Sequence, residues 1–376
     1  MNRKYHPLFE PFSLRSGITL KNRVVMAPMT NFSSNPDGTV SAGEVNYYAR
    51  RSGGVGMVIT SCIYVTPNGK GFPGEFGGHS DEMIPGLRRL AAAIKEQGAV
   101  AVLQIFHGGR SCPPDLVPGG DVVSASAVAE EKEGAVTPRA LTEAEVEEII
   151  RAFGETTRRA IEAGFDGVEI HGANGYLVQQ FFSPHSNRRE DRWGGSLQKR
   201  MAFPLAVVNE VKRVIAAHAK KPFIFGYRFS PEEPETPGIT MADTLALTDL
   251  LADQELDYLH ISLQDFWSTP RRGVADNRPR VEIIHEQVKD RVPLIGVGFI
   301  HTADEALKAL ETGVPMIALG RELIMEPDWV QKVSEGKESE IATTLKKDAE
   351  VQARLVIPEP LWQAIIHTPG WFPVVD

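Results

Sequence analysis

Three residues within six positions carry side chains that suit chemistry on an oxygen and its neighbouring carbon. His171, Asn174 and Tyr176 follow a short apolar run in DGVEIHGANGYLVQQFFSPHSNRREDRWGGS, the segment from Asp166 to Ser196. Because His171 and Asn174 lie three residues apart in a turn that leaves a strand, both can donate to one oxygen, as oxyanion-hole donors do. A phenol, with a pKa of about 10, is a sufficient acid toward a carbanion. A core histidine or a packed tyrosine would explain each residue singly, but the three together favour a catalytic site.

The rest of the chain predicts the scaffold that would hold these residues. Eight short β-rich runs alternate with amphipathic helical stretches, and they cover residues 24–27, 56–61, 100–106, 167–171, 223–229, 258–262, 294–297 and 316–319. Ser41 precedes one helical stretch, and Thr142 with Glu145 and Thr302 with Glu305 have capping-box spacing. Eight such units predict an α/β fold, a (β/α)₈ TIM barrel, since parallel strands need cover on both faces and a closed ring has no edges. A doubly wound sheet is the alternative, disfavoured because no GxGxxG motif follows the first run.

We predict one domain over residues 1–376, with two additions to the barrel. The stretch 108–138, after the third strand, is rich in Pro, Gly and Ser and is interpreted as an insertion that forms a small hairpin. The tail, from about residue 340 to 376, contains IPEPLWQAIIHTPGWFPVVD. Its apolar and aromatic side chains predict packing on the barrel or on a neighbouring molecule, which is compatible with a homo-oligomer.

In such a barrel the residues that follow the strands share one face, where the active sites of these folds lie. Besides the three residues above, the predicted mouth holds Pro28, Met29, Thr30, Cys62, Gln104, His107, Arg228, Ser262, Gly298, Gly320 and Arg321. The last two strands run into GVGFIHTADEA and ALGRELIMEPDW, which place glycine backbone at the start of a helix, where free N–H groups bind anions. Arg321 adds a fork for phosphate oxygens. The sequence therefore favours a phosphate site here, with glycines that serve only tight turns as the alternative.

Composition narrows the partners and the kinds of site. The chain has 40 Lys+Arg against 49 Asp+Glu, a formal charge of −9, and no basic run, so a nucleic acid or an anionic membrane is not an expected partner. No apolar segment has the length of a signal peptide or a membrane span, and we predict a cytoplasmic protein. Cys62 and Cys112 are too few for a disulfide framework, a four-cysteine zinc site or an iron–sulfur cluster. No metal site is predicted, and His107 and His185 are interpreted as structural or substrate-side groups.

Several segments together resemble the old yellow enzymes, FMN-dependent ene-reductases with a (β/α)₈ fold. The resemblance rests on LFEPFSL, LKNRVVMAPMT, HGANGYLVQQFFSPHSNRREDRWGGS and LGRELIMEP, which occur in the family's order over most of the chain. The central segment is similar to the family pattern HxAxGYLxxxFxSPxxNxRxDxYGGS, with Trp193 where Tyr is more usual. The resemblance implies FMN as cofactor and NADH or NADPH as reductant. It also implies hydride transfer to the β carbon of an α,β-unsaturated carbonyl, or of a related electrophile, in a small-molecule substrate.

The resemblance also assigns individual roles. His171 and Asn174 correspond to the donors to the substrate oxygen, and Tyr176 corresponds to the acid that protonates Cα. The implied FMN ligands are Ala27, Pro28, Met29, Thr30, Cys62 (through its backbone), Gln104, Arg228, Gly298, Phe299, Gly320 and Arg321. The implied substrate contacts are His171 and Asn174, with Phe32 where some relatives have a Tyr that reaches the substrate. Apart from the resemblance, the loop from Leu263 to Arg280 supplies Phe266 and Trp267, which are predicted to cover the flavin and contact the substrate. Some relatives send a C-terminal Arg into a partner's active site, but no Arg follows Arg354 in this chain.

Two other functions fit parts of the sequence. The same flavin could oxidise an amine or an alcohol, as in larger relatives with iron–sulfur clusters. Because the chain has only two cysteines, too few to hold such a cluster, transfer of electrons from the flavin to a cluster is disfavoured. A phosphate-binding barrel without redox chemistry, such as an aldolase or isomerase, would need a catalytic Lys inside a strand. None of the eight runs contains one.

Overall fold

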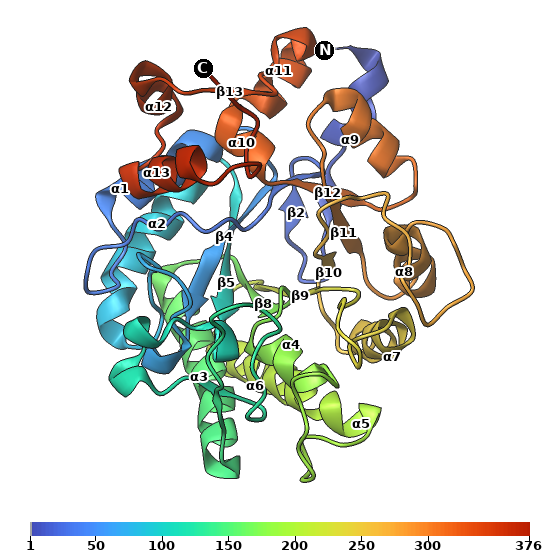
Figure 1. The fold of residues 1–376 in the computed structure, drawn as a ribbon. Helices are drawn as coiled ribbons and strands as arrows, with labels where there is room; N and C mark the ends of the chain where they lie inside the picture. The colour runs from blue at the N-terminus through green and yellow to red at the C-terminus, as the bar shows by residue number, and fades with distance from the viewer. Residues whose placement is uncertain (1) are drawn as a thin grey trace.

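The centre of the structure is a closed ring of eight parallel strands with helices around it (Figure 1). It is a computed structural model that describes residues 2–376. Around the ring the strands follow chain order: β3 (Val24–Met26), β4 (Met57–Tyr64), β5 (Val100–Phe106), β8 (Gly167–Gly172), β9 (Ile224–Phe229), β10 (Tyr258–Ile261), β11 (Leu294–Val297) and β12 (Met316–Leu319). All eight predicted strands are present, although β4 extends beyond its predicted end to Tyr64. The prediction of a (β/α)₈ barrel is confirmed.

The helices surround this ring, and their starts follow local capping chemistry. They are α1 (Ala42–Arg51), α2 (Ile84–Glu96), α3 (Glu143–Ala163), α4 (Leu177–Phe182), α5 (Leu197–Arg200), α6 (Ala202–His218), α7 (Met241–Ala252), α8 (Arg280–Val288), α9 (Ala303–Leu310), α10 (Arg321–Met325), α11 (Trp329–Glu335), α12 (Ala349–Leu355) and α13 (Glu359–His367). Capping boxes at Thr142 and Thr302 are formed as predicted, and Ser41, predicted to open a helix, also forms one with Glu44. A fourth one pairs Thr240 with Asp243 at the start of α7. Each box satisfies backbone donors that the first turn of a helix leaves free.

Inward-facing side chains fill the ring in layers. The deepest layers are apolar and include Val25, Met57 and Ile224, which pack with Leu14 and Leu20 of a short N-terminal hairpin. The strands of that hairpin are β1 (Phe12–Ser13) and β2 (Thr19–Leu20), which pair antiparallel. The hairpin was not predicted, and it closes the end of the ring opposite the mouth. The inward-facing polar residues Gln104, Glu169 and His260 lie in the layers nearer the mouth.

The insertion after β5 differs from the predicted hairpin. Its strands β6 (Val123–Ser124) and β7 (Arg139–Ala140) pair in parallel, which a hairpin cannot do. Three short 3₁₀ turns precede them, η4 (Gly109–Ser111), η5 (Pro114–Leu116) and η6 (Pro118–Gly120). The guanidinium of Arg110 donates to the carbonyls of Val128 and Ala129, each at 3.1 Å. The chain between β6 and β7 therefore crosses back before it pairs, and Arg110 holds part of this crossing.

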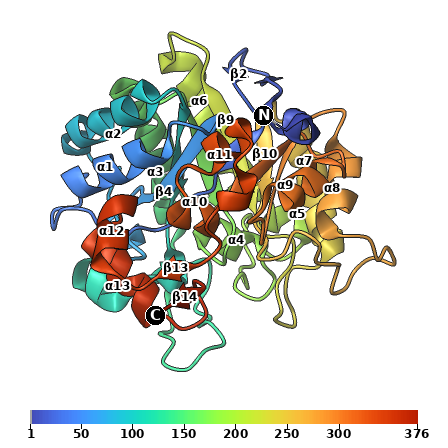
Figure 2. The ribbon, with the colours of Figure 1, turned by 90° about the horizontal axis from the view of Figure 1, so that it is seen from above.

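The C-terminal tail lies on the barrel. In Figures 1 and 2 its red helices α12 and α13 sit beside α1. Trp362 and Ile365 belong to the same apolar core as the barrel helices, and Arg51 of α1 donates to the Leu355 carbonyl at 2.6 Å. The tail ends in β14 (Val374–Val375), which pairs in parallel with β13 (Leu345–Lys346). This path brings residues 370 and 371 back to the mouth of the barrel.

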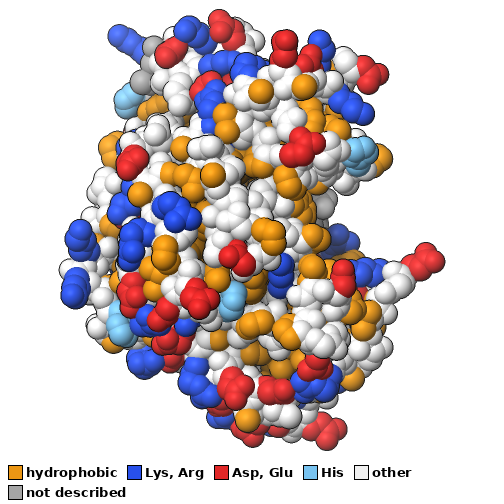
Figure 3. All heavy atoms as spheres, turned by 90° about the vertical axis from the view of Figure 1, so that its left-hand side faces the viewer, with side chains coloured by type: hydrophobic (Ala, Val, Ile, Leu, Met, Phe, Trp, Pro, Cys, Tyr) orange, Lys and Arg blue, Asp and Glu red, His pale blue; other side chains and the backbone are white. Residues whose placement is uncertain are grey.

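The surface and the described residues contain few other features of note. Charged side chains of both signs are interspersed over the face drawn in Figure 3. Within residues 2–376 no helix has the length and apolar character needed to cross a bilayer. The same residues hold no group of three or more His, Cys, Asp or Glu arranged to bind a metal ion.

Candidate active site

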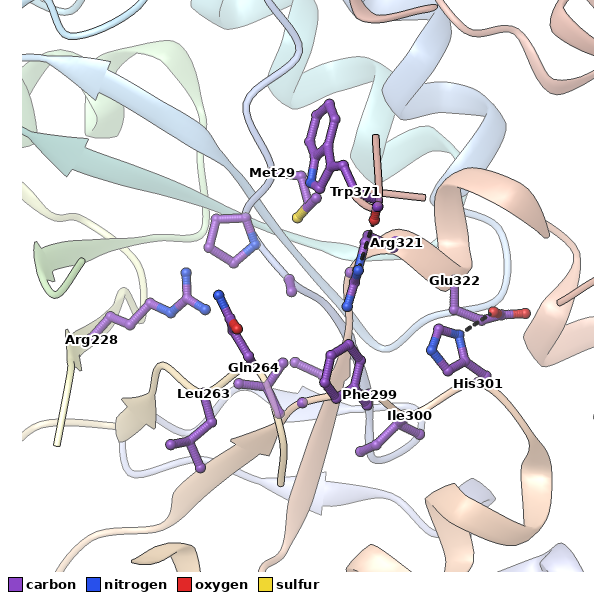
Figure 4. Close-up of a pocket in the computed structure, with 17 residues that line it drawn as sticks. Met29, Arg228, Leu263, Gln264, Phe299, Ile300, His301, Arg321, Glu322 and Trp371 are labelled. Carbon is purple, nitrogen blue, oxygen red and sulfur yellow. Dashed lines mark hydrogen bonds and ion pairs between the residues drawn. The ribbon is translucent and has the colours of Figure 1, made fainter. Parts of the chain in front are cut away.

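A cavity of about 350 Å³ opens at the C-terminal end of the barrel, between the ends of β3, β9, β11 and β12. Eight of the eleven predicted cofactor ligands line it: Ala27, Pro28, Met29, Arg228, Gly298, Phe299, Gly320 and Arg321. Figure 4 shows Arg228 entering from one side, with Phe299, Arg321 and Trp371 on the other. Segments far apart in the sequence thus form one concave site, as predicted for the barrel mouth.

One end of the cavity is built from backbone that only certain residues can adopt. Gly298 has a φ of 132°, and a Cβ there would lie 2.5 Å from the backbone nitrogen of Phe266, so only glycine fits. Phe299 follows with a φ of 46°, also in the left-handed region. Gly320 directly precedes Arg321, the first residue of α10. This turn geometry exposes main-chain groups to the cavity.

Arg321 connects this end of the cavity with the tail. Its Nη1 donates to the Trp371 carbonyl at 2.7 Å, and its guanidinium lies 4.9 Å from the centre of the Phe299 ring. Gly370 and Trp371 themselves line the cavity, as do His301 and Glu322, whose Nδ1 and Oε2 atoms lie 2.8 Å apart in a hydrogen bond. These four residues were not predicted. The aromatic, Gly-containing tail offered a weak signal, but the return of the chain to the mouth is a tertiary feature.

Arg228 is the most conspicuous polar group in the cavity. Its side chain is 7% exposed, and no hydrogen bond or ion pair joins its guanidinium to any residue between 2 and 376. Burial lowers the pKa of Arg228, an effect that Glu169 opposes. A buried cation without a bonded partner is costly. The site is therefore chemically incomplete around Arg228 and suited to an electron-rich or anionic ligand.

The other three predicted cofactor ligands adjoin the cavity from deeper positions. Gln104 and Cys62 are paired neighbours on β5 and β4, and both are buried. Burial raises the pKa of the Cys62 thiol well above its usual value, although a hydrogen bond with the Thr30 side chain lowers it. The thiol is consequently protonated and not a nucleophile. Gln104 donates to Glu169 at 2.8 Å, a partner that was not predicted.

His171 lies at the end of β8 with a side chain that is 4% exposed. Its Nδ1 accepts from the backbone N–H of Ala173 at 3.3 Å, which leaves the proton on Nε2. Burial lowers the pKa of His171 to about 3, and the charge of Arg228 acts in the same direction. At neutral pH the residue is therefore a neutral imidazole with a free N–H donor.

Asn174 is held by two serines. Its backbone N–H donates to Ser230 Oγ at 2.8 Å, and its Oδ1 accepts from Ser262 Oγ at 2.6 Å. The residue has a φ of 58°, a conformation that Asn tolerates better than most residues. Because Ser262 occupies Oδ1, the Nδ2 donor is the end of the carboxamide that remains available. Ser262 was predicted at the mouth, but its role in orienting Asn174 was not.

Tyr176 stands in an aromatic cluster beside His171. Its ring centre lies 5.1 Å from that of His171, 4.7 Å from Phe106 and 6.0 Å from Phe72. Its hydroxyl has no hydrogen bond to the described residues, and burial raises its pKa, so the phenol is protonated. Phe32 packs edge-on against Phe72, with ring centres 6.1 Å apart, and so lies next to this cluster.

Phe266 and Trp267, two of the predicted substrate contacts, are not where the prediction places them. Phe266 is fully buried and its ring packs against Gly296, so it is a core residue and not the expected cover of the cavity. The missing side chain of Gly296 on β11 leaves the space that this ring fills. Trp267 packs beside Phe266, with Lys308 of α9 at 4.6 Å from its ring centre. Neither residue lines the cavity.

His107 and His185, the two other histidines singled out in the sequence, are hydrogen-bonded to neighbouring loops. His107 Nδ1 accepts from the Gly109 N–H at 3.0 Å, and Nε2 lies 3.1 Å from Asn68 Oδ1. Burial lowers the pKa of His107 to about 3. His185 lies between Arg110 at 3.1 Å and Glu131 at 3.0 Å, and so ties the insertion to the loop after α4.

Comparison with known proteins agrees with this geometry. A model of the NADH:flavin oxidoreductase / NADH oxidase family matches residues 7–340. The chain belongs to this family. It is therefore an FMN-dependent, NADH- or NADPH-dependent flavin oxidoreductase, and the predicted cofactor and reductant are confirmed.

Relatives of this flavin oxidoreductase differ in length. The probable NADH-dependent flavin oxidoreductase YqiG of Bacillus subtilis (strain 168) is 57% identical over 376 residues, the whole of both chains. The NADH:fumarate oxidoreductase of Klebsiella pneumoniae (strain 342) is 45% identical over 359 residues, which is 95% of this chain but 38% of that protein. Among solved structures, the old yellow enzyme from Trypanosoma cruzi has a TM-score of 0.75 and 29% identity, with 88% of this chain and 93% of that one covered. The resemblance to the old yellow enzymes is thus confirmed.

The residues present fit FMN. The flavin has a polar ring system that accepts hydrogen bonds and a phosphate that requires donors, and the cavity offers the free guanidinium of Arg228 at one end and Arg321 with open backbone at the other. The lining between these two ends is partly apolar and includes Ala27, Pro28 and Met29. Such a division of polar and apolar contacts is typical of cofactor sites.

Proposed function

We propose that this flavin oxidoreductase reduces the carbon–carbon double bond of α,β-unsaturated carbonyl compounds. The observation that carries the proposal is the pair of neutral donors at the mouth, His171 Nε2–H and Asn174 Nδ2–H, each oriented by a bond at its other polar atom. Preorganised donors of this kind stabilise an oxygen that gains negative charge. Tyr176, protonated and in ring contact with His171, lies beside them.

The roles of the side chains follow from the charge that develops during such a reduction. When bound, FMN would be the source of the hydride that reduces the β carbon, a reduction that places negative charge on the carbonyl oxygen. His171 and Asn174 bind that oxygen, and Tyr176 donates its proton to Cα as a general acid. Because the pKa of His171 is lowered to about 3, its donor is neutral and does not compete with Tyr176 for the acid role.

The same proposal assigns the flavin contacts. Arg321 and the backbone at Gly298, Phe299 and Gly320 hold the phosphate, whereas Arg228 binds the ring system and stabilises the negative charge of the reduced form. Gln104, Thr30 and the Cys62 backbone complete the ring contacts from β5, β3 and β4. Phe32, next to the Tyr176 cluster, is the proposed substrate contact from the loop after β3.

The curated relatives support the substrate class. The relative from Klebsiella pneumoniae is named for fumarate, which is itself an α,β-unsaturated carboxylic acid. This chain spans 38% of that protein, so reduction of fumarate there does not have to occur on the shared part. We therefore propose enones as substrates of this chain and treat unsaturated carboxylates as a class to be assayed beside them.

The test follows the flavin absorbance under nitrogen. NADH or NADPH should bleach the visible band, and cyclohexenone should restore it. The variant His171→Ala/Asn174→Ala should lose about 10²-fold or more in the rate of restoration, the range for a lost oxyanion donor. It should also bind phenol, which mimics the enolate oxygen, far more weakly than the wild type does.

A matched control is His218→Ala, an exposed histidine at the end of α6, remote from the mouth. It should behave as wild type. Normal turnover with cyclohexenone in the double variant would refute the donor roles. Bleaching by NADH without restoration by any enone or unsaturated acid would show that the physiological acceptor is of another class.

A further inference from the structure

Directly below the mouth the barrel contains a buried carboxylate that the proposed reaction does not use. Glu169 of β8 is 0% exposed and accepts three hydrogen bonds from other strands. Gln104 Nε2 donates to Oε1 at 2.8 Å, the Tyr258 hydroxyl donates to Oε2 at 2.8 Å, and His260 Nδ1 donates to Oε2 at 3.0 Å. A buried carboxylate is tolerated only with such partners, and an apolar residue would fill the same position at less cost. Its presence points to a role beyond packing.

The strand register places Glu169 relative to the cavity. Gln104 pairs with Glu169, and Glu169 pairs with Gly226, which in turn pairs with Tyr258, so these positions form one inward-facing layer. Two residues further along the strands, His171 pairs with Arg228, and Arg228 pairs with His260. Arg228 lines the cavity. Glu169 therefore lies one layer beneath the residues that line and adjoin the cavity.

Glu169 determines which end of Gln104 remains free. The Nε2 group of Gln104 is bound to the carboxylate, so its Oε1 is the atom that can accept a hydrogen bond from a ligand. Without this contact the amide could turn either way. The carboxylate thus gives the side chain a single orientation, that of an acceptor.

Glu169 is also the counter-charge of Arg228. Burial alone raises the pKa of Glu169, but His260, Arg228 and Gln104 together hold it below its usual value, so it is ionised. Burial lowers the pKa of His260, an effect that Glu169 opposes. Glu169 and Arg228 are thus buried opposite charges in adjacent layers of the barrel, without a direct ion pair between them, and Arg228 is the one that lines the cavity.

We propose that Glu169 is a positioning residue for the flavin, which fixes Gln104 as an acceptor and lowers the reduction potential by offsetting the charge of Arg228. Two-electron reduction adds negative charge to the ring system. A guanidinium stabilises that charge and a carboxylate opposes it, in a region where burial strengthens both interactions. The inference rests on the assignment of Gln104 and Arg228 to the flavin, but not on the identity of the electron acceptor.

The experiment compares Glu169→Gln with wild type in two measurements that do not use an electron acceptor. The first is the midpoint potential of bound FMN, from equilibration with a reference dye, and the second is the FMN dissociation constant of the apoprotein from flavin fluorescence. Glu169→Gln removes the charge and keeps one acceptor oxygen, which can serve either Gln104 or the pair Tyr258 and His260. It should shift the reduction equilibrium about tenfold to hundredfold toward reduced flavin, or about 30 to 60 mV for a two-electron couple.

Glu169→Asp makes the complementary change, because it keeps the charge but withdraws the oxygen from Gln104. It should weaken FMN binding about fivefold, the equivalent of one hydrogen bond, with little change in potential. Glu44→Gln is the control, since it alters a buried glutamate of α1 outside the cavity and should change neither value.

The outcomes distinguish the idea from a purely structural role. An unchanged or lowered potential in folded, flavin-loaded Glu169→Gln would overturn the electrostatic part, and wild-type FMN affinity in Glu169→Asp would overturn the positioning part. If Glu169→Gln does not fold, as judged by thermal unfolding, Glu169→Asp alone decides the positioning part. Failure of enone reduction in wild type would leave both measurements interpretable.

Discussion

The replacement Tyr176→Phe separates the catalytic role of this residue from its packing. The ring of Tyr176 contacts Phe106, His171 and Phe72, with ring centres 4.7, 5.1 and 6.0 Å away. Its hydroxyl makes no hydrogen bond to the described residues, so phenylalanine keeps every contact that the structure shows and removes only the proton donor. The variant should be as stable as wild type within about 0.5 kcal/mol.

The expected kinetic effect is confined to one half of the catalytic cycle. Hydride arrival at the flavin needs no proton from Tyr176, and flavin reduction by NADH should stay within a few-fold of wild type. Completion of alkene reduction does need that proton. Loss of a general acid typically costs about 10²-fold or more, equivalent to about 2.7 kcal/mol of activation free energy. Reoxidation by oxygen or a quinone requires no protonation at a specific carbon and should be spared.

Stopped-flow absorbance measures the two halves separately. Bleaching of the flavin band by NADH reports the first half, and its recovery with cyclohexenone reports the second. Recovery at the wild-type rate would show that Tyr176 is not the acid and that water or another donor is. If both halves slow together while stability is retained, the residue maintains the shape of the site instead.

Two further predictions test an orienting contact and a buried acid. Ser262→Ala removes the 2.6 Å hydrogen bond that orients the Asn174 carboxamide, and phenol affinity should fall about fivefold. The control Ser334→Ala on α11 should have no effect. Equal phenol affinity in Ser262→Ala and wild type would refute the orienting role. Burial raises the pKa of Glu44 from 4.5 to about 8, so the folded state retains a proton that the unfolded state releases as pH rises through this range, and stability should fall from about pH 4.5 to about pH 8. Glu44→Gln should remove that fall and raise the melting temperature relative to wild type at pH 8 but not at pH 4.5. The control is Glu96→Gln, at an exposed position. An unchanged pH dependence of stability in Glu44→Gln would contradict the assignment.

Much of the fold followed from the sequence because its signals are local. A β-rich run is recognisable within a few residues, and a capping box such as Thr142 with Glu145 involves positions three apart. Eight repeats of a strand followed by a helix then favoured a closed (β/α)₈ barrel, in which every strand has a neighbour on both sides and helices cover the ring. The segment from His171 to Tyr176 was also readable, since its residues are close in the chain and leave one strand together.

The chemistry around those residues depended on contacts that no local pattern specifies. Arg321 and Trp371 are 50 positions apart, and Glu169 and Tyr258 are 89 apart. Phe266 was expected over the cavity and is buried against Gly296, because the space available to a ring depends on the neighbouring strand. The sequence by itself determined the eight strands of the ring and most of the side chains that their ends bring to the mouth. Only the closure of the ring and its register decided which of them meet, since a register shift of one residue would turn every inward side chain outward.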